Sequence, residues 1–145
     1  MMIEGLNIYL VIGGVLSGLA ALLHVIIVFK GATWYRYFGA GERMATQAEQ
    51  GSWIPAIVTL GIAGVLFIWG LYAFSGVGLV QPLPYLKGAL IIIASIYLIR
   101  GLVLFPALII RPDLVDGFAV WSSLSSLVFG VCYALGTWQA WEQLA

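Results

Sequence analysis

The sequence has little charge. Charged residues make up 8% of its 145 residues, against about 25% in a typical soluble domain. The six basic and six acidic side chains cancel, and they form no basic block of the kind that binds nucleic acid. Because 63% of the residues are hydrophobic, the chain cannot cover its own surface with polar groups in water. The scarcity of charge therefore excludes a soluble domain and predicts an integral membrane protein.

Cysteine and histidine are almost absent. A single cysteine, Cys132, excludes an intrachain disulfide and any CxxC pattern. The lone histidine, His24, gives no metal-binding cluster and no pair of haem ligands within one chain. The nucleophile motif G-x-S-x-G, the zinc motif H-E-x-x-H and the phosphate-binding loop are also missing. We therefore expect no metal and no cofactor, and no motif points to a catalytic residue.

Long hydrophobic runs are what the sequence has in abundance. A helix needs about 20 apolar residues to cross a bilayer. Four segments reach that length: residues 6–29, 53–75, 86–108 and 118–140. None alternates polar and apolar residues as a barrel strand does, and short connections make consecutive helices antiparallel. The sequence thus predicts an all-α fold, an integral membrane four-helix up-down bundle that forms one domain over residues 1–145.

The positions of lysine and arginine predict the orientation. No basic residue precedes the first run, which continues to Phe29, so it reads as a retained helix and not as a cleavable signal. Connections 30–52 and 109–117 lie on one side of the membrane, and the other side carries only Lys87. Positive residues stay cytoplasmic. We therefore predict a multi-pass protein of the bacterial inner membrane with both termini periplasmic. The basic residues of the cytoplasmic side are Lys30, Arg36, Arg43 and Arg111.

The connection over residues 30–52 is too apolar for a solvated linker. Its stretch WYRYFGAGE holds four aromatic residues, and Gly39 and Gly41 permit a tight reversal of the chain. The following GERMATQAEQG reads as a short amphipathic helix bounded by glycines. We expect an interfacial or re-entrant segment folded against the mouth of the bundle.

Arg100 stands within the third apolar run. A charge at this depth costs about 2.5–3.5 kcal/mol on insertion scales, so it faces the bundle interior or a water-filled cavity. If Pro106 ends the regular helix, Arg100 instead lies close enough to the cytoplasmic edge to snorkel. Tyr97, three residues earlier, lies on the same helix face. His24 is expected at a similar depth. Both interpretations of Arg100 remain open.

Glu42 is the nearest carboxylate that the connection offers to these residues. Its position predicts a cluster of Glu42, Arg100 and His24, capped by Arg36, because an ionisable group at membrane depth needs a partner. The alternative is that Glu42 lies in headgroup water.

Small residues recur on three of the apolar runs. Such residues let helix backbones approach closely in lipid, and the repeats indicate either packing within the bundle or dimerisation. The repeats are Gly14 with Gly18, Gly61 with Gly64, and Ser126 with Gly130 and Ala134.

Several motifs together resemble a known family. They are a histidine near the end of the first run, WYR-F-GAGE, GSW-P and YL-RGL. The chain resembles a family of small four-span proteins of proteobacterial inner membranes over about two thirds of its length. The resemblance implies the four-span topology and no reaction. It draws attention to His24, Trp34, Tyr35, Arg36, Glu42, Trp53, Pro55, Tyr97 and Arg100.

Three hypotheses for the function follow. The first is binding of a lipid-like or quinone-like apolar molecule in a pocket near the cytoplasmic leaflet, since apolar walls with a few polar groups are typical of ligand sites. The second is a membrane enzyme in which His24 and Glu42 do acid–base chemistry on a lipid-like substrate. The third is a structural accessory subunit, as a homo-oligomer or within a larger membrane complex. The predicted ligand-binding residues are His24, Trp34, Tyr35, Arg36, Glu42, Tyr97 and Arg100.

Overall fold

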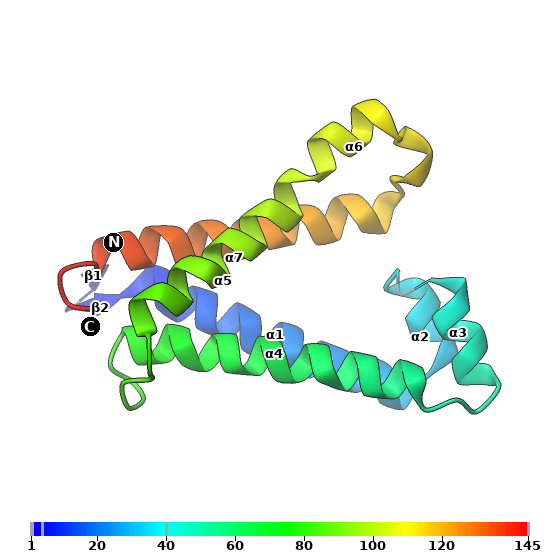
Figure 1. Ribbon diagram of the computed structural model, residues 1–145, viewed down its shortest axis with the longest axis horizontal. Helices are drawn as coiled ribbons and strands as arrows, with labels where there is room; N and C mark the ends of the chain where they lie inside the picture. Colours follow the sequence, from blue (N-terminus) through cyan, green and yellow to red (C-terminus); the bar gives the residue numbers. More distant parts are fainter. Residues whose placement is uncertain (1, 4, 40, 145) are drawn as a thin grey trace. The chain divides into compact units, whose positions relative to one another are not determined.

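Helices dominate the computed structural model, which describes residues 2–3, 5–39 and 41–144 (Figure 1). A short antiparallel pair of strands, β1 (Met2–Ile3) and β2 (Leu6–Asn7), precedes them. The helices are α1 (Ile8–Lys30), α2 (Ala32–Tyr37), α3 (Glu42–Glu49), α4 (Ile54–Gly76), α5 (Leu86–Leu102), α6 (Leu104–Ile110), the single 3₁₀ turn η1 (Pro112–Leu114) and α7 (Gly117–Gln139).

Four helical segments are long and apolar enough to cross a membrane. They are Ile8–Lys30, Ile54–Gly76, Leu86–Ile110 and Gly117–Gln139. At 1.5 Å per residue each is longer than a hydrocarbon core of about 30 Å. The predicted ranges differ from these bounds by two residues or fewer at every end. The prediction of an all-α protein with four membrane spans is confirmed.

Pro106 explains the break in the third span. A proline inside a helix has no N–H for the carbonyl four residues earlier, and its ring clashes with that carbonyl. The residue four positions before Pro106 is Leu102, and α5 ends there. The chain turns at Val103 and continues as α6 (Figure 1). The regular helix therefore ends four residues before the proline, and Arg100 lies in the last turn of α5.

The described residues fall into two compact units. The four-helix unit contains the residues up to Ser17 and those from Ile68 onward. The hairpin unit contains residues 18–67. Helices α1 and α4 each contribute residues to both units.

Consecutive helices alternate in direction within the four-helix unit. Asn7, just before α1, donates a hydrogen bond from Nδ2 to the carbonyl of Gly136 near the end of α7, at 2.6 Å. At the end of α4, a Cβ built on Gly76 would lie 2.9 Å from Leu10 of α1 and 3.2 Å from Leu90 of α5. The starts of α1 and α5 thus meet the ends of α4 and α7, as an up-down bundle requires.

Glycines let α5 and α7 approach each other closely. A Cβ at Gly130 would lie 2.9 Å from the backbone nitrogen of Leu98, and one at Gly101 would lie 2.8 Å from the carbonyl oxygen of Ser123. Gly14 packs in the same way on the ring of Phe74. These contacts favour the bundle-packing interpretation for the repeats that hold Gly14 and Gly130.

The hairpin unit is built on a glycine turn. Gly39 and Gly41 have φ values of 73° and 96°, which other residues rarely adopt, and they fold α2 back on α3. Tyr35 of α2 and Ala45 of α3 are buried against Ile27 of α1. The prediction of a short helix bounded by glycines is confirmed by α3. The helix α2 was not predicted, because its aromatic run has no helical period.

Tryptophans mark the ends of the spans. Trp53 directly precedes α4, and Trp121 and Trp138 lie near the two ends of α7. Their side chains are 77%, 75% and 75% exposed. Amphipathic rings at span ends are typical of residues that sit at the level of the lipid headgroups.

Candidate functional site

The seven predicted site residues divide between the two units. Tyr97 and Arg100 belong to the four-helix unit, and the other five belong to the hairpin unit. A joint cluster of Glu42, His24 and Arg100 draws on both units, and it stays a prediction.

Arg36 and Glu42 are brought together by the glycine turn. Arg36 lies in the last turn of α2, and its Nε and Nη2 donate to the carboxylate of Glu42 at 3.0 Å and 2.8 Å. Its Nη1 donates to Glu49, in the last turn of α3, at 2.7 Å. These hydrogen bonds hold the pKa of both carboxyls below their ordinary value and raise the pKa of Arg36. The predicted cap Arg36 is thus the direct partner of Glu42.

The Arg36 ion pairs predict that the hairpin loosens in acid. The carboxyl pKa values are lowered by folding, so the stabilisation is complete above the ordinary glutamate range near pH 4.3 and is lost as pH falls through the lower folded values. We expect the protection of the α3 amides against hydrogen exchange, relative to an unstructured peptide at the same pH, to fall below about pH 4. Arg36→Gln should remove this pH dependence. Unchanged protection in the wild type over that range would contradict the prediction.

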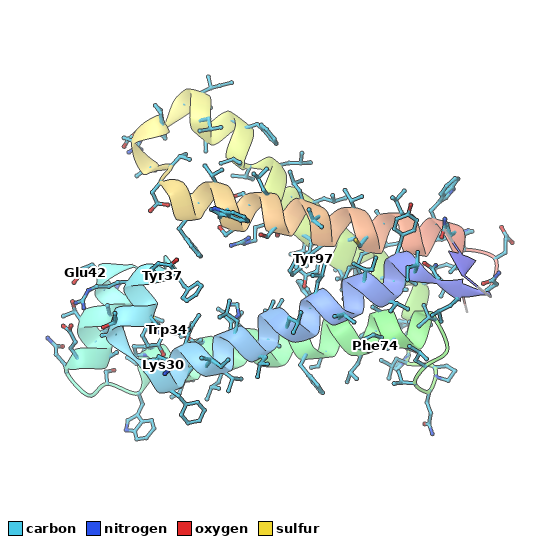
Figure 2. The ribbon with its side chains drawn as sticks, turned by 180° about the vertical axis from the view of Figure 1, so that it is seen from behind. Lys30, Trp34, Tyr37, Glu42, Phe74 and Tyr97 are labelled. Atoms are coloured by element: carbon cyan, nitrogen blue, oxygen red, sulfur yellow. The ribbon has the colours of Figure 1, made fainter. Side chains whose placement is uncertain are left out.

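The aromatic residues of the hairpin differ in how far they are buried, and Figure 2 labels two of them, Trp34 and Tyr37. Tyr35 is 2% exposed and belongs to the small core. Trp34 is half-buried, with its ring centroid 5.5 Å from that of Phe38 and 5.8 Å from Nζ of Lys30. Tyr37, which was not among the predicted site residues, is 74% exposed. Of the aromatic residues of α2, Tyr37 therefore presents the most surface.

The side chain of His24 is hydrogen-bonded to the backbone of its own helix. Its Nδ1 lies 2.7 Å from the carbonyl oxygen of Ala20, one turn earlier. Because a carbonyl only accepts, Nδ1 carries the proton and donates. Nε2 is left as the nitrogen through which a neutral His24 accepts a hydrogen bond. Glu42, bound by Arg36, is not the group that orients this ring.

Arg100 finds a partner on the neighbouring helix. Its Nη1 donates to the backbone carbonyl of Ser122 in α7 at 3.0 Å. The side chain is exposed on the surface of the four-helix unit, and Arg100 is the fifteenth residue of the Leu86–Ile110 span. A backbone carbonyl is a common partner for a charge at this depth. The guanidinium of Arg100 thus has an acceptor on α7.

Tyr97 belongs to a buried hydrogen-bond chain that sequence reasoning missed. Ser17 Oγ of α1 lies 2.8 Å from the hydroxyl of Tyr97 and 2.9 Å from that of Tyr133 in α7. Tyr133 in turn donates to the carbonyl of Trp69 in α4 at 2.8 Å. The chain thus joins all four helices of the unit. The sequence held one signal for this chain. Ser17 lies one turn after Gly13 and Gly14, and Tyr133 lies one turn after Gly130, so both hydroxyls follow small residues at the helix contacts.

Counting protons fixes the direction of this chain. A hydroxyl has one proton to donate, and Tyr133 uses its proton on the carbonyl of Trp69. Ser17 must therefore donate to Tyr133, and Tyr97 must donate to Ser17. Tyr97 is the first donor, and its hydroxyl oxygen accepts no hydrogen bond from the other members of the chain.

Three aromatic rings pack around the side chain of Tyr97. The centroid of its ring lies 5.0 Å from Trp69, 5.3 Å from Phe129 and 5.5 Å from Tyr133. Tyr97 is 5% exposed. Its side chain is thus part of the core of the four-helix unit, whereas Arg100, one turn later, is at the surface.

Two cavities lie away from the predicted residues. One of about 260 Å³ lies at the end of the four-helix unit, between Asn7, Ser75, Leu86 and Leu144. The other, of about 220 Å³, lies along α7 beside Trp121 and Val128. None of the seven predicted residues lines either cavity.

Comparison of the chain with protein-family models, with curated proteins and with solved structures gave no match. The resemblance to the proteobacterial four-span family therefore stays a prediction carried by the motifs quoted above.

Proposed function

We propose that this chain is a small multi-pass protein of the bacterial inner membrane that binds a lipid-like or quinone-like amphiphile, with the polar head of the ligand at Arg100. Both termini are periplasmic in this proposal, on the support of the lysine and arginine distribution.

The observation that carries the proposal is an incompletely satisfied guanidinium on an apolar surface. Arg100 has five N–H groups, and in the described part of the chain its hydrogen bond is the one to Ser122. The neighbouring Ile96, Ile99 and Val103 are exposed. A cation among lipid-facing side chains needs further acceptors. The head group of an amphiphile supplies them while its tail covers the apolar neighbours.

Removal of Arg100 tests the proposal. The protein is released in a mild detergent and analysed by native mass spectrometry as wild type, Arg100→Ala and Arg43→Ala. Arg43 is an exposed arginine of α3 that serves as the matched control. We expect a bound amphiphile on the wild type and on Arg43→Ala, and its loss from Arg100→Ala. An empty wild type with an Arg100→Ala variant of equal thermal stability would overturn the proposal.

A second candidate, the accessory subunit, is favoured by the glycines of α4. A Cβ on Gly61 or Gly64 would meet nothing within 4 Å, so these glycines serve no contact in the described residues of the chain. Small residues on an open face are suited to a partner helix. This function predicts a protein that is unstable alone and is stabilised by its partner. No contact described above favours acid–base chemistry by His24 and Glu42.

A further inference from the structure

Two arginines of this protein bind carboxylates through the edge of the guanidinium that carries Nε and Nη2. Arg36 holds Glu42 with Nε at 3.0 Å and Nη2 at 2.8 Å. Arg111 holds Asp113 with the same two nitrogens, at 3.1 Å and 2.8 Å. Two parallel N–H groups match the two oxygens of a carboxylate, which makes this geometry strong and selective.

Arg100 offers the same edge without a carboxylate. Its hydrogen bond to the carbonyl of Ser122 uses Nη1, the nitrogen outside that edge. Among the described residues, Nε and Nη2 of Arg100 have no hydrogen-bond partner, and no ion pair involves Arg100. The contact with Ser122 orients the guanidinium. It leaves the two-pronged edge, formed by the N–H groups of Nε and Nη2, for another molecule.

An apolar track leads away from this edge along α5. Ile96 and Ile92 precede Arg100 by four and eight residues, so they lie on its helix face. Ile92 is 60% exposed and Ile96 44% exposed. The track spans about 12 Å at 1.5 Å per residue. Ile91 and Ile99, which are 43% and 62% exposed, flank it, so this face of α5 is apolar enough to lie along a hydrocarbon chain.

We infer that Arg100 binds the carboxylate of a long-chain carboxylic acid through Nε and Nη2, with the acyl chain along Ile96 and Ile92. This inference rests on the proposed function and specifies its ligand. The negative head complements the one guanidinium, and the pair is neutral in the membrane, where an isolated charge is costly. A carboxylate presents two oxygens to Nε and Nη2 as Glu42 does to Arg36 and Asp113 does to Arg111.

The test compares a carboxylate with neutral and phosphate-bearing amphiphiles. Oleate, methyl oleate and dioleoylphosphatidylglycerol are titrated separately into the full chain in a non-ionic detergent, and bound ligand is counted by native mass spectrometry. We expect one oleate per chain and no comparable binding of the other two. Arg100→Lys keeps the charge without the two-pronged edge, so it should bind oleate about ten- to a hundredfold more weakly. Arg111→Lys, the matched control at an arginine with the same edge geometry, should bind as the wild type does.

Each contrary result has a defined meaning. Equal oleate binding by the wild type and Arg100→Lys would overturn the inference, and so would tighter binding of methyl oleate or of the phospholipid. Binding of a neutral amphiphile that depends on Arg100 would refute the carboxylate and leave the proposed function standing. If no amphiphile binds in a way that depends on Arg100, both the inference and the proposed function fail.

Discussion

Replacing Tyr133 by alanine should cost about 3–5 kcal/mol in the free energy of unfolding, as for other buried aromatic residues. Tyr133 is fully buried, packs against Gly13 and stands in the middle of the hydrogen-bond chain. Its loss leaves a cavity and removes the acceptor of Ser17. The measurement is unfolding in mixed micelles with increasing SDS, followed by circular dichroism.

Trp138 provides the control for Tyr133. It lies on the same helix and is 75% exposed, so Trp138→Ala should change the unfolding free energy by no more than about 0.5 kcal/mol. Tyr133→Phe keeps the ring and isolates the hydroxyl, for which membrane hydrogen bonds average about 0.6 kcal/mol. Equal losses for Tyr133→Ala and Trp138→Ala would show that Tyr133 is not part of a packed core.

Gly130→Ala should destabilise the four-helix unit by about 1–3 kcal/mol, the usual cost of forcing an extra group into a packed interface. The new methyl group would lie 2.8 Å from Leu98 Cγ and 2.9 Å from the backbone nitrogen of Leu98. A backbone atom cannot move aside as a flexible side chain does. Helices α5 and α7 would have to separate, and the SDS concentration at the midpoint of unfolding should fall.

Gly64→Ala is the matched control in the middle of another span. A Cβ there meets nothing within 4 Å, and alanine is the better helix former. The two substitutions make the same chemical change. Gly130→Ala should lower the free energy of unfolding, whereas Gly64→Ala should leave it unchanged or raise it. A loss of stability in Gly64→Ala as large as that in Gly130→Ala would indicate that Gly64 also packs against another helix.

The membrane spans could be predicted because their signal is local. Twenty apolar residues in a row fix a helix in lipid, where every backbone group needs an internal partner. The helix break at Pro106 also follows from the covalent structure of that residue, and α5 ends four residues before it. The glycines around α3 likewise act on their own backbone, which is why the short helix there was anticipated. These features depend on few residues beyond those that form them.

The partners of the polar residues could not be predicted in the same way. The sequence indicated Arg36 only as a cap on the Glu42 cluster, whereas in the hairpin Arg36 is the direct partner of Glu42, six residues away. The reversal that joins them depends on φ angles at two glycines. Tyr97 was grouped with Arg100 because they are three residues apart. A difference of three residues also rotates a side chain by about 60° around the helix, and that turns Tyr97 into the core and Arg100 to the surface.

The exposed tryptophans at the ends of the spans decide what fluorescence of this protein reports. Trp53, Trp121 and Trp138 present about three quarters of their surface to the surroundings, whereas Trp69 packs edge-on against Tyr97. Trp141 is also exposed, at 40%, so we expect most of the emission of the chain to come from indole rings in contact with headgroups or detergent. It follows changes in the amphiphile around the protein more closely than changes in the bundle core.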